Sequence, residues 1–298
     1  MHRALGRGAH SGDCDAVLET QGVMRTRDAA AALHRCAVVD RREAAPGIVV
    51  LGVRAPALAA AASPGQFVMI VPPHGERAAT ALGIYEASGE RVSFMTFAVG
   101  PRTREIAEVR AGETLELLGP LGCGFDVAAL GDDVAIVAGG VGIASVRLLA
   151  EALAARGARQ TLYYGARTAT ALVDVEAFEA LGARVVLATD DGSRGRAGFV
   201  PPLLAEAIDH DAVAACGPTP MLRATARVAE RRGWPAQLSL EEAFACGVGA
   251  CWGCVVPIDR GSASAPAFPE VAAGEPRAYV HARICTEGPV FLASDLRW

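Results

Sequence analysis

The sequence contains neither lysine nor asparagine, so its 28 Lys-or-Arg positions are all arginine. Without lysine, a phosphate-binding loop of the Walker type is excluded, because that loop needs its lysine. Catalysis through a lysine Schiff base is excluded for the same reason. Without asparagine, the chain has no acceptor for N-glycosylation. These two absences narrow the possible chemistry before any motif is considered.

A basic surplus and long apolar runs are missing as well. The 28 basic residues face 33 acidic ones, which leaves a formal charge of -5 and gives no basic surface for nucleic acid. No run reaches the roughly 18 apolar residues of a membrane-spanning helix, and the N-terminal residues lack the apolar stretch of a secretory signal. We therefore expect a cytoplasmic protein, in which eight cysteines indicate metal or redox chemistry rather than disulfides.

Changes in composition and hydrophobic pattern along the chain predict several domains. Residues 1–33 are polar and aperiodic, and we expect a flexible N-terminal extension there. Residues 34–130 contain short β-rich runs separated by glycine, proline and charged turns, which predicts an antiparallel β-barrel. Two segments inside this region, 57–62 and 103–110, have the composition of short helical connectors.

Beyond residue 130 strand-like runs alternate with helical ones. The expected helices lie near 144–156, 174–181, 200–208 and 221–232. This alternation predicts βαβ units and a parallel sheet, and hence an α/β nucleotide-binding domain over 131–236. Residues 237–298 are rich in glycine and cysteine and predict a smaller C-terminal lobe, with a Pro/Ala/Ser-rich loop at 262–276. The predicted fold class is therefore α+β multidomain.

Four cysteines of the C-terminal lobe have a characteristic spacing. Cys246, Cys251 and Cys254 form C-x4-C-x2-C, and Cys285 follows later. This is the plant-type spacing of a [2Fe-2S] cluster. The small residues between the cysteines allow the loop to wrap closely around two irons. A zinc site is the alternative, although zinc ribbons usually have two C-x2-C pairs.

Three motifs of the α/β region lie where predicted strands end. Gly139, Gly140 and Gly142 form a turn whose N–H groups suit a phosphate, although close packing of strand and helix also explains them. The other two motifs contain Asp190 with Asp191 and Cys216 with Gly217. Ligands of open α/β sheets bind beyond the carboxyl ends of strands, so these residues are the candidate nucleotide site. The two aspartates predict NADH over NADPH, whereas the neighbouring Arg194 and Arg196 favour the 2′-phosphate.

Six stretches together resemble one family. They are G-P-L-G-C-G-F at 119–125, A-G-G-V-G-I-A at 138–144, T-D-D-G-S-R-G at 189–195, A-C-G-P-T-P-M at 215–221, L-S-L-E-E-A-F-A-C-G-V-G-A-C-W-G-C at 238–254 and I-C-T-E-G-P-V-F at 284–291. In this order and over about residues 35–298, the chain resembles the electron-transfer subunit of type B dihydroorotate dehydrogenase, within the ferredoxin–NADP reductase superfamily.

The resemblance implies a barrel that binds FAD, a domain that binds NAD and a [2Fe-2S] lobe ligated by the four cysteines. It places Cys216 and Gly217 near the nicotinamide. It also implies a hetero-oligomer with a catalytic, FMN-containing dihydroorotate dehydrogenase subunit of pyrimidine biosynthesis. NADH gives up two electrons as a hydride whereas a [2Fe-2S] cluster accepts one, so a flavin must lie between them. No acid–base catalytic residue is expected.

The flavin motif of this family is altered here. The usual Arg-Pro-x-Ser matches Thr80 to Gly83 in the best register, and a shifted register retains only Arg77. The usual Gly-x-Gly-Thr reads as residues 100–103. The candidate flavin contacts are Thr80, Leu82, Gly83, Met95, Phe97, Arg102, Thr103 and Gly119. Two alternatives follow from the alteration: an NAD(P)H–ferredoxin-type oxidoreductase or hydrogenase subunit, or a relay or docking subunit without flavin.

Overall fold

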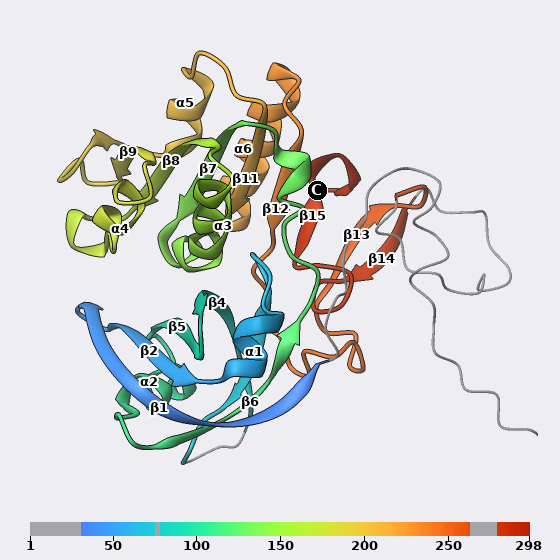
Figure 1. Cartoon of the computed structure of the whole chain (residues 1–298). Coiled ribbons are helices and arrows are strands. Elements are labelled where there is room, and N and C mark those ends of the chain that lie inside the picture. The colour runs from blue at the N-terminus through green and yellow to red at the C-terminus, as the bar shows by residue number, and fades with distance from the viewer. Residues whose placement is uncertain (1–30, 75–77, 263–278) are drawn as a thin grey trace, which may run out of the picture.

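The structure, a computed structural model, describes residues 31–74, 78–262 and 279–298. Nearly all of the expected N-terminal extension and of the loop expected at 262–276 lies outside these ranges, as does Arg77. The described chain forms a barrel below and a helix-covered sheet above, with the C-terminal segment beside both (Figure 1). No helix within these ranges combines the length and apolarity needed to cross a membrane.

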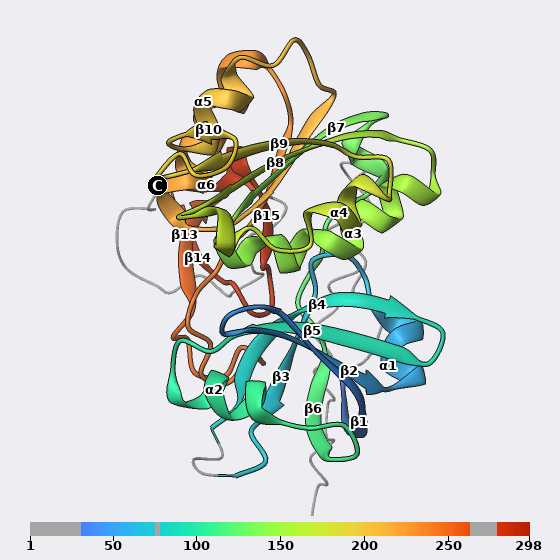
Figure 2. The ribbon, with the colours of Figure 1, turned by 90° about the vertical axis from the view of Figure 1, so that its left-hand side faces the viewer.

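Six antiparallel strands close into a barrel in the order β1-β2-β5-β4-β3-β6. They are β1 (Ala32–Ala45), β2 (Ile48–Arg54), β3 (Phe67–Val71), β4 (Thr80–Ser88), β5 (Arg91–Phe97) and β6 (Thr114–Leu121). The helices α1 (Pro56–Ala61) and α2 (Pro101–Glu108) lie where helical connectors were expected (Figure 2). Leu51, Ile70, Phe94 and Leu117 are fully buried in the barrel core. The predicted antiparallel barrel is confirmed.

A second sheet of seven strands has the order β10-β9-β8-β7-β11-β12-β15. Its strands are β7 (Asp133–Gly139), β8 (Arg159–Ala166), β9 (Arg184–Thr189), β10 (Arg196–Ala197), β11 (Ala212–Cys216), β12 (Ala236–Ser239) and β15 (Val290–Leu292). Its helices are α3 (Ile143–Ala155), α4 (Val175–Glu179), α5 (Val200–Ala205) and α6 (Thr219–Arg232). All neighbouring strands are parallel except the pair β12–β15, so the predicted α/β architecture is confirmed.

Both faces of this sheet are covered, because successive side chains of its central strands point to opposite sides. Ile136 of β7 packs with Leu149 of α3 on one face. Its neighbour Val137 packs with Leu204 of α5 and Val228 of α6 on the other. Helix α3 also packs across β4 of the barrel and thereby joins the two bodies (Figure 2).

The C-terminal segment is built onto the sheet. Strands β13 (Val255–Asp259) and β14 (Tyr279–Arg283) form a two-stranded antiparallel ribbon, and β15 then returns to pair with β12. The sheet therefore continues past residue 236, where we expected the nucleotide-binding domain to end. The buried Leu238 lies in the middle of β12, paired with Ala215 of β11 and Phe291 of β15.

Candidate cofactor site

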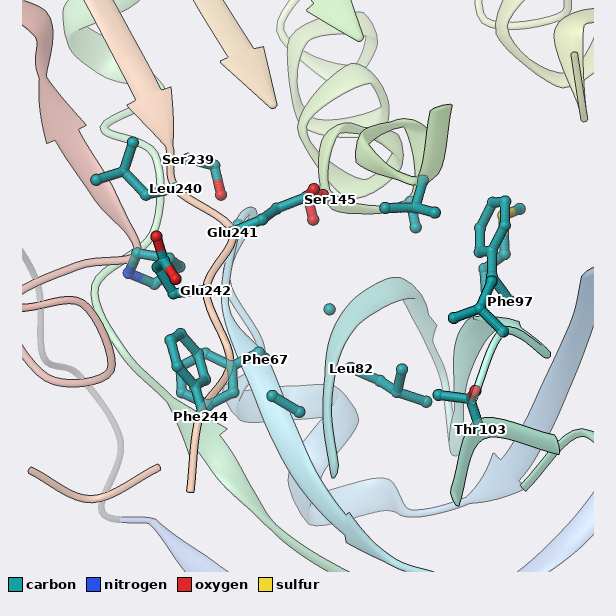
Figure 3. A pocket seen from close by; sticks show the side chains of 18 residues that line it. Phe67, Leu82, Phe97, Thr103, Ser145, Ser239, Leu240, Glu241, Glu242 and Phe244 are labelled. Atoms are coloured by element: carbon teal, nitrogen blue, oxygen red, sulfur yellow. The ribbon is translucent and has the colours of Figure 1, made fainter. Parts of the chain in front are cut away.

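A pocket lies between the barrel and the carboxyl edge of the parallel sheet (Figure 3). Its lining residues are Gly65, Phe67, Ala81, Leu82, Gly83, Met95, Phe97, Val99, Thr103, Val141, Ala144, Ser145, Ser239, Leu240, Glu241, Glu242, Phe244 and Pro289. They come from β3, β4, β5 and the start of α2 on one side, and from the start of α3 and the chain after β12 on the other. The pocket thus occupies the sheet edge at which open α/β sheets bind ligands.

Strands β4 and β5 separate at this pocket. Their ladder ends at the pair Ile84–Phe94. Beyond that pair, Gly83 is in register with β3, and Met95 and Phe97 are in register with β2. On the facing edges of β4 and β5, backbone N–H and C=O groups beyond Ile84–Phe94 therefore lie outside the ladder. Such groups need hydrogen-bond partners.

Aromatic side chains make part of the wall. The rings of Phe67 and Phe244 lie 4.8 Å apart, centroid to centroid, with an interplanar angle of 51°. Phe67 belongs to the barrel, whereas Phe244 belongs to the segment that leads into Cys246 (Figure 3). The pocket is therefore two residues away from the first cysteine of the C-x4-C-x2-C motif.

The first turn of α2 lies at the barrel end of the pocket. The hydroxyl of Thr103 accepts a hydrogen bond from the N–H of Gly100 at 3.0 Å and contacts its carbonyl oxygen at 3.1 Å. Arg102 is exposed and donates to the carbonyl oxygen of Ala79 at 3.2 Å, beside the start of β4. The Oγ1 atom of Thr80 is buried and has no hydrogen-bond partner among the described residues. An orphaned hydroxyl and an exposed guanidinium therefore lie close together here.

Of the expected flavin residues, Leu82, Gly83, Met95, Phe97 and Thr103 line the pocket. Thr80, Arg102 and Gly119 do not. Gly119 is buried on β6, where a Cβ atom would lie 2.6 Å from Cγ1 of Val68, so its role in the structure is close packing of two strands.

The glycines at the end of β7 bring two chain segments together. A Cβ atom on Gly142 would lie 2.2 Å from the carbonyl oxygen of Cys216, and one on Gly139 would lie 2.6 Å from the sulfur of Met221. Gly217 packs against Gly139 in turn. Gly140 differs, because it has a positive φ of 53° and nothing within 4 Å of an added Cβ. Close packing thus explains three of these glycines, and turn geometry explains Gly140.

Cys216 ends β11 as a fully buried thiol. It donates a hydrogen bond to Oε1 of Glu241 at 3.5 Å. Burial, together with the nearby Glu241 carboxylate, raises the pKa of Cys216 well above its usual value, while the hydroxyls of Ser145 and Ser239 act in the opposite direction. Burial also raises the pKa of Glu241. The pocket therefore has a thiol that stays protonated directly behind its wall.

The two aspartates after β9 have different surroundings. Asp191 accepts hydrogen bonds from the backbone N–H and the hydroxyl of Ser193, at 3.0 and 2.6 Å, and these bonds lower its pKa. The carboxylate of Asp190 is exposed and has no partner among the described residues. Arg196 forms an ion pair of 2.6 Å with Glu206, and Arg194 lies 3.8 Å from Glu176. Both arginines that would favour a 2′-phosphate thus already face carboxylates.

The four cysteines of the motif influence one another electrostatically. Cys251 acts to lower the pKa of Cys246, whereas burial, and after it Cys254 and Cys246, raise the pKa of Cys285. Among the described residues, no group of three or more His, Cys, Asp or Glu side chains is already arranged to hold a metal ion. A [2Fe-2S] cluster takes four thiolates, and a structural zinc ion can take four as well, so the choice between them rests on the spacing of the motif.

The loop that carries three of these cysteines directs backbone groups inward. Gly247, Gly249 and Trp252 all have positive φ values. Burial opposes ionisation of Cys246, but hydrogen bonds from the backbone at Val248, Cys251 and Ala250 and from the Cys251 side chain lower its pKa to about 6. The loop thus stabilises a thiolate with N–H groups, as an iron–sulfur ligand requires.

Several residues of the pocket were not predicted from the sequence. Glu241, Glu242 and Phe244 lie within the stretch 238–254, which indicated the family and the cysteine motif, but none of the three was a predicted site residue. Ser145 follows the glycine turn by three residues. The signal that marks them is their position directly after a buried strand or a glycine turn at the sheet edge.

Comparisons with known proteins agree with this geometry. A family model described as an oxidoreductase NAD-binding domain matches residues 136–227. One similar solved structure is that of an NADH-dependent reduced ferredoxin-NADP oxidoreductase, reported in a study of flavin-based electron bifurcation. It is 25% identical in sequence and has a TM-score of 0.73, and the match covers 88% of this chain and 90% of that one.

Two relatives share more of the sequence, and both are named dihydroorotate dehydrogenase B (NAD(+)), electron transfer subunit. The protein of Shouchella clausii is 35% identical over 241 residues, which is 78% of this chain and 86% of the relative. The protein of Enterococcus faecalis is 33% identical over 268 residues, which is 87% of this chain and 96% of the relative. From this identity and coverage, the chain belongs to the family of electron transfer subunits of dihydroorotate dehydrogenase B.

Proposed function

We propose that this chain transfers electrons between NAD(H) and a catalytic dihydroorotate dehydrogenase subunit, through FAD in the pocket and a [2Fe-2S] cluster on the cysteine loop. It acts as the oxidoreductase subunit of a hetero-oligomer and needs its partner for activity. The proposal follows from the family of the chain and from the residues around the pocket.

One observation carries the proposal. The pocket is lined on one side by the edge of the nucleotide-binding sheet, with Ser145 and Ser239, and on another by Phe244, which precedes Cys246. A group bound there would contact both the nucleotide side and the cysteine side of the molecule. This is the position that an intermediate electron carrier requires.

The residues present fit a flavin. The gap between β4 and β5 offers free backbone edges, and Phe67, Phe97 and Phe244 offer ring faces. The first turn of α2, with Arg102 beside it, offers N–H groups and a positive charge to a pyrophosphate. When bound, FAD accepts the two electrons of a hydride together and passes them on singly. The chain positions the ring and keeps it between the two other carriers.

The residues also fit NAD(H) better than its phosphorylated form. The open carboxylate of Asp190 would accept hydrogen bonds from ribose hydroxyls and repel a 2′-phosphate. Arg196 is engaged by Glu206, and Arg194 faces Glu176, so neither guanidinium is free for that phosphate. The turn with Gly140 would hold the nucleotide phosphates.

An anaerobic titration with NADH tests the proposal. Purified protein is expected to show flavin absorption together with a [2Fe-2S] envelope, and both are expected to bleach as NADH is added. In a Cys251→Ser variant the flavin band should still bleach, whereas the cluster envelope should be missing. Protein that contains zinc without iron, or that holds no flavin in excess FAD, contradicts the proposal.

A second candidate comes from the solved structure described above, whose title names a ferredoxin-NADP oxidoreductase. In that case the cluster would exchange electrons with a ferredoxin-type carrier. Coexpression with the catalytic dihydroorotate dehydrogenase subunit separates the two. A stable complex that reduces NAD+ with dihydroorotate supports the first candidate, and the absence of both complex and reaction supports the second.

A further inference from the structure

Gly83 and Ser145 approach each other across the junction of barrel and sheet. A Cβ atom on Gly83 would lie 3.1 Å from Oγ of Ser145, and the three heavy atoms nearest to it all belong to that serine. Gly83 is on β4, and Ser145 is in the first turn of α3. The serine hydroxyl thus occupies the space in which a side chain of residue 83 would end.

The barrel wall of the pocket has little side-chain polarity of its own. Its lining residues are Gly65, Phe67, Ala81, Leu82, Gly83, Met95, Phe97, Val99 and Thr103. The hydroxyl of Thr103 is used by Gly100 at the start of α2. Side-chain hydrogen bonds to a ring held against β4 must therefore come from the opposite wall, which has Ser145, Ser239, Glu241 and Glu242. Ser145 is the one placed beside β4.

The hydroxyl of Ser145 is available for such a bond. It lies close enough to Cys216 to act on the pKa of that thiol, which it lowers, and a thiol sulfur is a weak acceptor. The thiol proton is directed to Glu241 instead, so Ser145 is not needed to accept it. A carbonyl oxygen or ring nitrogen is a stronger acceptor than a thiol sulfur, and it would take the serine proton.

We propose that Ser145 donates a hydrogen bond to the edge of the flavin ring from the nucleotide-binding side. Strand β4 cannot donate this bond through a side chain, because residue 83 is glycine. This inference rests on the proposed function, because it requires FAD in the pocket. It makes Ser145 a flavin-binding residue of the domain that otherwise binds NAD, so the flavin would bridge both bodies of the protein.

A hydroxyl exchange between the two positions tests the inference. Apoprotein is titrated with FAD and binding is followed by flavin fluorescence. Ser145→Ala should weaken FAD binding by roughly 2- to 12-fold, the equivalent of one ordinary hydrogen bond. Gly83→Ser alone should also weaken it, because the new side chain would crowd Ser145. In the double variant Gly83→Ser/Ser145→Ala, the hydroxyl is returned to β4 and the space is vacated, so affinity should recover to within about twofold of the wild type.

The matched control is Ser88→Ala. Ser88 also carries a hydroxyl, but it lies exposed at the other end of β4, outside the pocket lining, and its replacement should leave the FAD affinity unchanged. Wild-type affinity in Ser145→Ala, a loss in Ser88→Ala as large as in Ser145→Ala, or a double variant no better than its parents overturns the inference. If the wild-type protein itself binds no FAD, the proposed function fails, and this inference fails with it. Flavin absorption maxima provide a second readout, which should shift in Ser145→Ala and return in the double variant.

Discussion

The hydroxyl of Tyr85 donates a hydrogen bond of 2.6 Å to the carboxylate of Asp174, and this bond joins the barrel to the nucleotide-binding body. Arg42 of β1 binds the same carboxylate with both of its terminal nitrogens, at 2.9 and 2.5 Å. Asp174 has a positive φ of 52° and directly precedes α4. Asp174 is thus an acceptor shared by two barrel residues at the junction of the two bodies.

Loss of the Asp174 charge should destabilise the protein. Asp174→Asn keeps a residue that tolerates the left-handed backbone but removes the charged acceptor shared by Arg42 and Tyr85. We expect a loss of about 1–2 kcal/mol, since Tyr85 is buried whereas Arg42 is half exposed and screened. This corresponds to a melting temperature lower by about 2–8 °C. Arg159→Ala, which breaks an exposed pair with Asp133, is the control and should change it by much less.

The same carboxylate predicts a pH dependence. Burial opposes its ionisation, but the hydrogen bonds from Arg42 and Tyr85 outweigh burial and hold the pKa of Asp174 below its usual value of 3.8. A group whose pKa is lowered on folding stabilises the protein above its unfolded pKa, and the effect is lost as the pH falls through the folded pKa. The difference in melting temperature between wild type and Asp174→Asn should therefore be constant above about pH 5 and shrink below pH 4. A difference that grows on acidification contradicts the assignment.

The order of elements could be predicted because its signals are local, and the cysteine site stays a prediction that rests on an equally local signal. Strand runs, the glycine turn at 139–142 and the spacing of Cys246, Cys251 and Cys254 are all read within short windows of sequence. From the sequence alone, the glycines of this turn could serve either to bind a phosphate or to let the strand and helix pack closely. In the structure, a Cβ atom added to Gly142 would lie only 2.2 Å from the carbonyl oxygen of Cys216, so close packing alone already requires glycine at this position.

The flavin pocket could not be predicted to the same extent because it depends on register and on distant contacts. The separation of β4 from β5 beyond Ile84 is a matter of register: Gly83 stays paired with β3, and Met95 and Phe97 stay paired with β2. Glu241 reaches Cys216 over 25 residues, and Ser145 reaches Gly83 over 62 residues of sequence. Gly119 was assigned to the flavin from a motif; it is not among the pocket-lining residues, and close packing against Val68 is a second reason for a glycine there.

Replacement of one cluster cysteine should remove the cluster and loosen the C-terminal ribbon. In Cys251→Ser, one of the four proposed cluster ligands is lost, so iron content should fall to near zero and the brown colour should be lost. The ribbon of β13 and β14 has few buried side chains, so its proteolysis should become faster without the metal. Cys123→Ser is the control, because its sulfur contacts the Thr286 carbonyl oxygen at 3.4 Å and is not one of the four. Full iron in Cys251→Ser, or loss of iron in the control, contradicts the ligand assignment.

Asp190 should determine the preference for NADH. Asp190→Ala removes the open carboxylate at the end of β9 and should raise the KM for NADH by about 5- to 10-fold, with a smaller change for NADPH. Asp191→Ala is a poor mimic of this change, since it also releases Ser193 and opens the turn. A matched variant is Glu206→Gln, which frees Arg196 from its ion pair and should improve NADPH while leaving NADH unchanged. Steady-state reduction rates with both nucleotides decide the question, and a wild-type preference for NADPH would refute it.

Arg102 should hold the flavin by its pyrophosphate. Its guanidinium is exposed beside the first turn of α2, within 3.2 Å of the Ala79 carbonyl oxygen, next to the buried and unpartnered hydroxyl of Thr80. Removal of one charge-assisted contact to a phosphate costs roughly tenfold in affinity or more, so Arg102→Ala should lose FAD on gel filtration while the cluster absorption stays. Arg104→Ala is the matched control, because Arg104 lies on the same helix but donates to the carbonyl oxygens of Ala98 and Val99. If both variants keep their flavin equally well, Arg102 does not hold the pyrophosphate, and the prediction is wrong.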